Sequence, residues 1–211
     1  DSGLPAEPVL IQGSTNRMAG GSVFGGASVL GLGVGFNQAS NIVLRDIQVS
    51  NVVRGVAITN SANIRLEGIE VRRASDRAFD LQLLARNIEL LNCVGHGGGI
   101  GAYLQQVTNV IIRNCVFWQN TNNAVFVGSQ VGALLENSIL GSTSANMALY
   151  SIAPPASGFS ANYNGLHAGP DTRVGVNRST SALADNLAAW QALSGGLDAR
   201  SVPGDPRMAD P

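Results

Sequence analysis

A five-residue motif that begins with asparagine recurs through the middle of this 211-residue chain. Successive copies start 22, 24 and 22 residues apart and read Asn41-Ile-Val-Leu-Arg, Asn63-Ile-Arg-Leu-Glu, Asn87-Ile-Glu-Leu-Leu and Asn109-Val-Ile-Ile-Arg. A repeat of this length is one supersecondary unit that cannot bury its apolar face alone. Such units become stable by stacking on their neighbours, so the period predicts a solenoid.

The residues inside each copy alternate in a way that predicts strands. Ile42 and Leu44 point to one side, whereas Val43 and Arg45 point to the other, which is a period of two. The next position holds residue types that tolerate a left-handed backbone and can turn the chain: Asp46, Gly68, Asn92 and Asn114. Two further short apolar segments follow in each copy. The sequence therefore predicts an all-β parallel β-helix with three short strands per coil of about 22–24 residues.

Stacking would place equivalent residues of neighbouring coils side by side, about 4.8 Å apart. The expected inward columns form a continuous apolar core: Ile42, Ile64, Ile88 and Val110 in one, and Leu44, Leu66, Leu90 and Ile112 in the other. On the outside, Arg45 would face Glu67, and Arg65 would face Glu89. Such pairs contribute roughly 0.2–1 kcal/mol each, which is consistent with this register but too little to decide the fold.

This pattern of asparagine-led strands and polar turns resembles the right-handed parallel β-helix repeat proteins of the pectate-lyase-like superfamily, over roughly residues 8–211. The resemblance implies a right-handed helix but says little about activity, because this scaffold hosts many unrelated functions. In that family, earlier coils and an N-terminal cap usually precede a segment like residues 8–13. We therefore expect the chain to be part of a longer protein.

A single domain is expected from the length of the chain. We divide it into an irregular first coil over residues 1–35, regular coils over residues 36–168, and a C-terminal helix and extended tail over residues 169–211.

The helix is predicted over Ser181–Leu193. Its apolar residues recur at intervals of four and three: Leu183, Leu187, Trp190 and Leu193. Ser181 or Asp185 would start the helix, and Gly195-Gly196 would stop it. The helix and tail would cover an end that is otherwise an open strand edge.

Composition excludes several classes of function. The net charge is −1, all thirteen basic residues are arginine, and no basic run exists, so nucleic-acid binding is not expected. No apolar run approaches the ~20 residues of a membrane span. With 45% hydrophobic and only 13% charged residues, the chain is also unlike a disordered protein.

Cys93 and Cys115 lie 22 residues apart at the same inward position. The favoured interpretation is two stacked core thiols, and a disulfide is the alternative, since stacked positions fall within the roughly 4.4–6.8 Å that a bridge spans between Cα atoms. No second Cys or His pair completes a zinc set, so neither a metal nor a cofactor is expected.

Two outward columns suggest a shallow groove. Arg72, His96 and Trp118 should align along one edge, and Asp80, Tyr103 and Phe126 along the next strand. Exposed aromatic rings beside arginines and carboxylates suit a sugar, because a ring face covers a pyranose and polar groups bind its hydroxyls. The expected substrate-binding residues are Arg73, Asp76, Asp80, Trp118 and Phe126. The alternative is a surface of scattered aromatics and salt bridges.

A catalytic role is a second hypothesis for the same region. The chain has no lysine base, and the acidic clusters that the family's hydrolases and calcium-dependent lyases use are not matched by its motifs. His96, Tyr103 and Arg72 would suit proton abstraction beside a uronate carboxylate that the arginine neutralises. His167, in a late turn, is interpreted as structural.

The sequence thus predicts a secreted or cell-surface β-helix that binds polysaccharide. One alternative is a polysaccharide lyase or hydrolase that uses the His96, Tyr103 and Arg72 set. The other is a structural or adhesive spacer of a large extracellular protein, whose open end permits end-to-end self-association.

Overall fold

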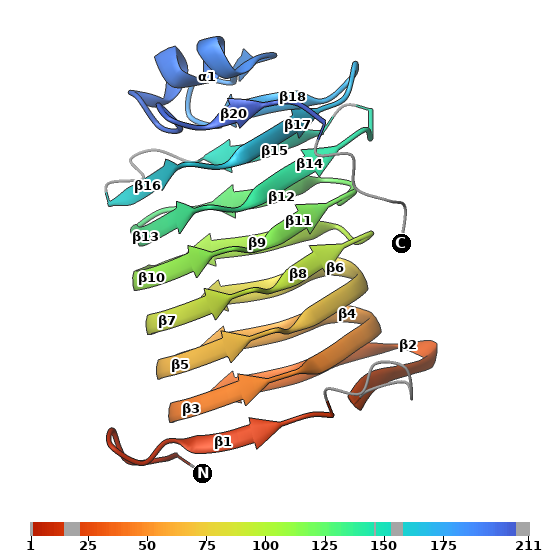
Figure 1. Cartoon of the computed structure of the whole chain (residues 1–211), viewed down its shortest axis with the longest axis vertical. Coiled ribbons are helices and arrows are strands. Elements are labelled where there is room, and N and C mark those ends of the chain that lie inside the picture. Colours follow the sequence, from red (N-terminus) through yellow and green to blue (C-terminus); the bar gives the residue numbers. More distant parts are fainter. Residues whose placement is uncertain (1, 15–21, 146, 153–157, 206–211) are drawn as a thin grey trace.

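The computed structural model shows a stack of coils, as the repeat predicts (Figure 1). The structure describes residues 2–14, 22–145, 147–152 and 158–205. Within these residues, the first strands of successive coils form a seven-stranded parallel sheet, here called the first sheet. It comprises β1 (Val9–Gln12), β3 (Ser40–Arg45), β5 (Ala62–Glu67), β7 (Arg86–Leu91), β10 (Val107–Arg113), β13 (Val131–Glu136) and β16 (Phe159–Asn162).

The second and third strands of the coils join into one 13-stranded sheet in the described part of the chain. The second strands are β8 (Val94–His96), β11 (Val116–Trp118), β14 (Ile139–Ser142), β17 (Gly165–Ala168) and β20 (Val202–Pro203). The third strands are β9 (Ile100–Gln105), β12 (Asn123–Val127), β15 (Ala148–Ile152) and β18 (Arg173–Asn177), with β19 (Ala182–Ala184) at the edge.

The early coils depart from the expected three separate strands. In β2 (Ser22–Asn37), β4 (Ile47–Thr59) and β6 (Glu70–Gln82), the second and third strands run together as one. Within β4 and β6 a single left-handed residue bends the strand without ending it: Asn51 (φ 54°) and Arg73 (φ 53°). In the next coil glycines 97–99 separate β8 from β9, because a run of glycine does not hold an extended strand.

The predicted register and core are confirmed. Ile42 pairs with Ile64, Ile64 with Ile88, and Ile88 with Val110. All residues of the two inward columns are buried. On the outside, Arg45 Nε lies 2.9 Å from Glu67 Oε2, and Arg65 Nη1 lies 3.5 Å from Glu89 Oε2.

The two cysteines are stacked core thiols. Cys93 and Cys115 are free and buried, so the disulfide alternative is not what the structure shows. Burial raises the pKa of the Cys93 thiol well above its ordinary value, which keeps this thiol protonated.

Left-handed residues form the corners of the coils. The position after the first strand is left-handed in every coil from the second onward, with φ between 52° and 64°: Asp46, Gly68, Asn92, Asn114, Asn137 and Tyr163. The expected turn column is therefore present, and it extends to Tyr163, a residue type that rarely adopts this conformation.

The asparagines that open the repeat form a side-chain ladder that the sequence analysis did not anticipate. Asn63, Asn87 and Asn109 each donate Nδ2–H to Oδ1 of the asparagine one coil earlier, at 2.8 Å. The first rung, Asn41, donates to the carbonyl of Gly3 at 2.7 Å. All four asparagines are left-handed, with φ between 52° and 57°. Asparagine suits this column because it tolerates that backbone and its carboxamide both donates and accepts.

The C-terminal helix is shorter than predicted. α1 spans Leu187–Ser194 and is capped by Asn186, whose side chain accepts from Ala189 N. The predicted start at Ser181 or Asp185 is wrong, because residues 182–184 instead pair antiparallel with β18. The predicted stop is confirmed, since Gly195 is left-handed with φ 75°. The tail beyond residue 205 lies outside the described residues.

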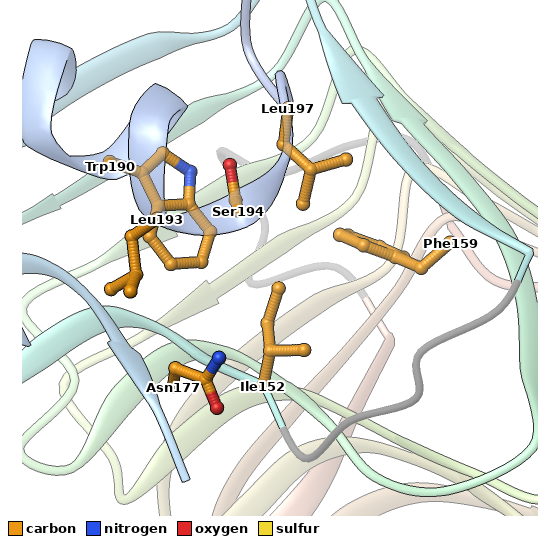
Figure 2. A pocket seen from close by; sticks show the side chains of 7 residues that line it. All are labelled: Ile152, Phe159, Asn177, Trp190, Leu193, Ser194 and Leu197. Atoms are coloured by element: carbon orange, nitrogen blue, oxygen red, sulfur yellow. The ribbon is translucent and has the colours of Figure 1, made fainter. Parts of the chain in front are cut away.

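The helix closes the C-terminal end of the core. Trp190 is buried and stacks on Tyr150, with ring centroids 5.0 Å apart. Its indole nitrogen donates to the buried carboxylate of Asp198, which Ser201 and Asn164 also contact. A cavity of about 220 Å³ lies beside Trp190 and Leu193 (Figure 2).

The N-terminal end differs from this capped end. Leu10, Ile11, Val23 and Phe24 are each between 41% and 53% exposed, because β1 and the start of β2 have no further coil beneath them among the described residues. End-to-end self-association through this surface stays a prediction.

The ladder can be tested at its central rung. We expect Asn87→Ala to lower the free energy of unfolding by about 2 kcal/mol, because it removes two ladder hydrogen bonds and puts alanine in a left-handed backbone. Asn87→Gly keeps the backbone relaxed and should lose about 1 kcal/mol, the contribution of the hydrogen bonds alone. Urea unfolding of both variants measures the difference, and no loss in either would contradict a stabilising ladder.

Candidate functional site

The two outward columns that the sequence suggested are both present. Strand pairing places Arg72 beside His96 and His96 beside Trp118 on the second strands. Asp80 pairs with Tyr103, and Tyr103 with Phe126, on the third strands. The side-chain contacts divide these residues between two clusters, one around Glu70 and one around Asp80.

The Glu70 cluster consists of Gln48, Glu70, Arg72 and His96. The Glu70 carboxylate contacts Arg72 Nε at 2.6 Å, Gln48 Nε2 at 2.8 Å and His96 Nε2 at 3.4 Å. The hydrogen bond from His96, with those from Arg72 and Gln48, lowers the pKa of Glu70 from 4.5 to about 2, against the opposing effect of burial. Two of the three expected catalytic residues, Arg72 and His96, therefore share this carboxylate as their partner.

Trp118 is not the exposed aromatic that the sequence suggested. It is only 8% exposed, and its ring stacks on His167 with centroids 5.5 Å apart. Gly141, between them in the column, makes this possible, because a Cβ there would lie 2.1 Å from the Trp118 ring. The interpretation of His167 as structural agrees with this contact, and the Trp118 ring is covered where a sugar would have to stack.

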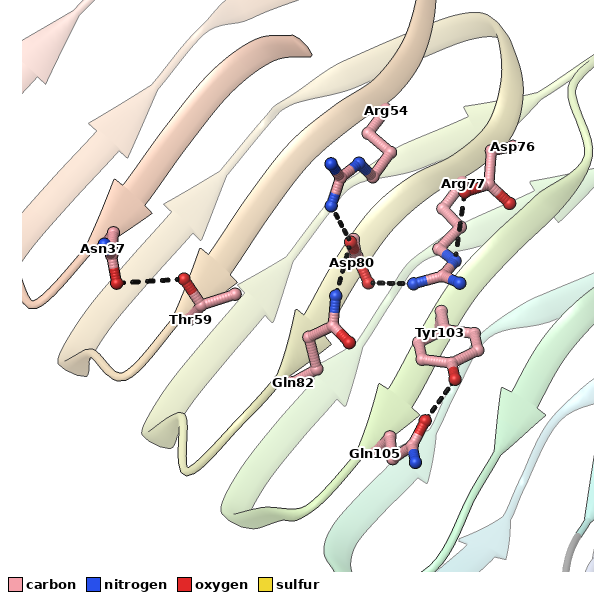
Figure 3. Close-up of polar contacts among 9 residues, drawn as sticks. All are labelled: Asn37, Arg54, Thr59, Asp76, Arg77, Asp80, Gln82, Tyr103 and Gln105. Carbon is pink, nitrogen blue, oxygen red and sulfur yellow. Dashed lines mark hydrogen bonds and ion pairs between the residues drawn. The ribbon is translucent and has the colours of Figure 1, made fainter. Parts of the chain in front are cut away.

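The Asp80 cluster consists of Arg54, Arg77, Asp80 and Gln82 (Figure 3). Asp80 is fully buried, yet it points outward from the sheet and is covered by its partners. Arg77 Nη1 approaches its carboxylate at 3.0 Å, Gln82 Nε2 at 3.0 Å and Arg54 Nη1 at 3.3 Å. Arg77 also pairs with Asp76, whereas the Arg54 side chain is 42% exposed, so the Arg54 guanidinium keeps N–H groups that can bind a further anion.

Tyr103 and Phe126 continue this face as a stack of rings. Their centroids are 4.6 Å apart and their planes 7° apart. Arg77 covers the outer face of Tyr103 at 3.7 Å, and Arg178 covers that of Phe126 at 4.8 Å. The expectation of ring faces open to a pyranose is therefore wrong here, since each face is occupied and only ring edges remain.

The other expected binding residues lie close to this cluster. The Asp76 carboxylate forms an ion pair with Arg77 Nε at 3.4 Å. Arg73 is exposed at the bend of β6. Tyr103 donates its hydroxyl to Gln105, so it is engaged with its own strand and not with Arg72 or His96.

Arg54 and Arg77, which organise the Asp80 cluster, were not among the residues predicted from the sequence. They are partners on neighbouring coils, but a register shift between Val52 and Arg54 moves them one residue out of the period. Aligning the coils by their third strands would have revealed this arginine column.

No group of three or more His, Cys, Asp or Glu side chains within the described residues could bind a metal ion. Likewise, no helix in this part of the chain is long and apolar enough to cross a bilayer.

Parallel coils with left-handed corners define a β-helix protein. A family model described as the right-handed beta helix region matches residues 8–143, and the chain belongs to this family. No curated protein sequence matches the chain.

Several solved structures are similar to the chain at low sequence identity. A tailspike protein variant of E. coli bacteriophage HK620, in complex with a pentasaccharide, matches with a TM-score of 0.50 and 14% identity over 74% of this chain and 38% of its own. The A-module of a mannuronan C-5 epimerase from Azotobacter vinelandii gives 0.45 and 15% over 81% of this chain. An alginate lyase from Paenibacillus sp. strain FPU-7 gives 0.46 and 13% over 83% of both chains. The chain spans 57% of the epimerase module and 38% of the tailspike.

The lowered pKa of Glu70 predicts acid sensitivity. A depressed carboxyl pKa stabilises the fold above pH 4.5, and this contribution is lost as pH falls toward about 2. We expect Glu70→Gln to lower the free energy of unfolding at pH 7 by about 3 kcal/mol and to flatten its decline over this window. Urea unfolding at a series of pH values measures both effects.

Glu89→Gln is the matched control, because Glu89 is 41% exposed and pairs with Arg65 alone among the described residues. Its loss should stay below about 1 kcal/mol. Equal losses in the two variants would contradict a special role for Glu70.

Proposed function

We propose that the chain binds an anionic polysaccharide along the outer face of its third strands, centred on the Asp80 cluster. The observation that carries this proposal is the pair Arg54 and Arg77, held on neighbouring coils by one buried carboxylate. Asp80 fixes the guanidinium groups in place, so little side-chain freedom remains to be lost when a ligand carboxylate binds.

The charged side chains on this face favour an acidic ligand. Arg54, Arg77 and Arg178 face this surface, against the two carboxylates of Asp76 and Asp80. The Arg54 side chain is 42% exposed, and its ion pair with Asp80 uses Nη1, so other guanidinium donors remain for a ligand. A uronate carboxylate matches the planar fork of such a guanidinium.

The rest of the face suits a polymer. Neighbouring coils present Thr59, Gln82 and Gln105 at paired positions, so hydrogen-bonding groups recur at strand spacing. A ligand that itself repeats can engage several of them at once. The tailspike protein, which shares the fold, is in complex with a pentasaccharide. A secreted or cell-surface location is part of this proposal, since polysaccharides of this kind are met outside the cell.

Binding is proposed ahead of catalysis. A lyase or hydrolase that uses His96, Tyr103 and Arg72 stays a prediction, and the contacts of Tyr103 with Arg77 and Gln105 do not favour it. A spacer role also stays a prediction.

Calorimetric titration of uronate oligosaccharides tests the proposal. We expect Arg54→Ala to weaken binding about tenfold or more, because it removes charge-assisted hydrogen bonds. Arg45→Ala is the matched control: Arg45 is 39% exposed and makes one ion pair, with Glu67, but lies on the first sheet. Its affinity should equal that of the wild type. Absence of uronate binding, or equal weakening by the two variants, would refute the proposal.

A further inference from the structure

The asparagine ladder on the first sheet is closed at one end and open at the other. Asn41 is tied to the Gly3 carbonyl, which ends the ladder at its N-terminal side. At the other side the next coil is one residue shorter, because Val107 pairs with Val131 but Val110 pairs with Ala133, so Asn109 has no strand partner there. Gly132 lies beside Asn109, and Gly158 lies beside Gly132. Neither glycine supplies a side-chain amide for the next rung.

The last rung therefore keeps an unused acceptor. In each earlier rung Oδ1 accepts from the asparagine one coil later. Asn109 donates to Asn87 in the same way, but among the described residues no side chain donates to Asn109 Oδ1. Gly132 is its neighbour on the next coil. An amide group placed there would continue the ladder.

An open hollow of the surface lies at this place. It measures about 340 Å³ and is lined by Asn109, Gly132, Gly158 and Ser160, with Ile111 and Leu134 as its apolar wall. A second hollow of about 260 Å³ shares Asn109 and Ile111 with it and runs back along the ladder. Together they form a groove across the first sheet, and their lining residues come from β5, β7, β10, β13 and β16 and from Gly158 just before β16. Figure 1 shows these strands as successive neighbours.

We propose that this groove binds an N-acetylated amino sugar, whose acetamido group takes the place of the missing rung. The acetamido N–H donates to Asn109 Oδ1, as an asparagine Nδ2–H does elsewhere in the ladder. Its methyl group lies against Ile111 and Leu134, and the sugar hydroxyls face Ser160 and solvent.

The charge of the groove favours a neutral ligand. The charged residues that line it are Arg65 and Glu89, which form an ion pair at 3.5 Å, so their charges cancel. The third-strand face, in contrast, carries Arg54, Arg77 and Arg178 against the two carboxylates of Asp76 and Asp80. The two sites lie on different faces and neither proposal depends on the other.

A pair of trisaccharides tests the proposal. N,N′,N″-triacetylchitotriose, here called chitotriose, differs from cellotriose only in carrying an acetamido group in place of one hydroxyl on each ring. In titrations followed by amide NMR shifts, we expect chitotriose to bind about tenfold or more tightly than cellotriose, with shifts around Asn109 and Gly132. No chitotriose binding, or equal binding of the two sugars, would overturn the proposal.

Gly132→Asn offers a variant that fills the hollow. A Cβ at Gly132 would meet its nearest atoms at 3.6 Å, an ordinary contact, so the fold should accept it. Its carboxamide would compete with the ligand for the space beside Asn109. We expect chitotriose binding to be abolished while the unfolding midpoint does not fall; undiminished binding would contradict the assigned site.

Two further variants test whether chitotriose binding depends on Asn109 or on the Asp80 cluster. Asn109→Ala removes the acceptor and should weaken chitotriose binding about tenfold. Arg54→Ala should leave it unchanged, so failure of this proposal is distinct from failure of uronate binding. Equally tight binding of N-acetyl-lysine amide would overturn the assignment to an amino sugar.

Discussion

Parallel pairing between neighbouring coils at a nearly constant register is the constraint on which this structure depends. It aligns Ile42, Ile64 and Ile88 in one dry column and sets the corner residues above one another. Each corner requires a left-handed residue, and the asparagines supply it while also bonding to each other. Backbone pairing, corner geometry and side-chain ladder therefore support the same register, as expected for a sequence whose local and global preferences agree.

The same stacking gives the outer faces different chemistry. On the third strands it brings arginines of successive coils together around the buried Asp80, and it stacks Tyr103 on Phe126 so that their ring faces are used internally. On the first sheet the stacking places Arg65 beside Glu89, so that their charges neutralise each other, and it leaves a groove lined by asparagine side chains. A solenoid can thus carry two unlike surfaces on one core, because inward and outward residues alternate along every strand.

Much of the fold could be predicted from the sequence, since the repeat, the period of two and the turn residues are local signals. The candidate site was harder to predict from the sequence than the fold. The columns of Arg72 with His96 and of Asp80 with Tyr103 follow from the period, but the covering of Trp118 by His167 depends on Gly141 lying between them. The helix start was misplaced because residues 182–184 gain more from pairing with β18 than from continuing a helical pattern.

The sequence by itself determined the winding of the chain, because stacking is the only way in which such short amphipathic repeats can bury their apolar faces. Only the tertiary structure decided which polar groups remain available. The left-handed asparagines could join into a ladder, and Asp80 could be enclosed by Arg54 and Arg77, only once coils more than twenty residues apart in sequence were in contact. Partner choice of this kind depends on the distances between side chains of different coils, which the order of residues along one strand does not specify.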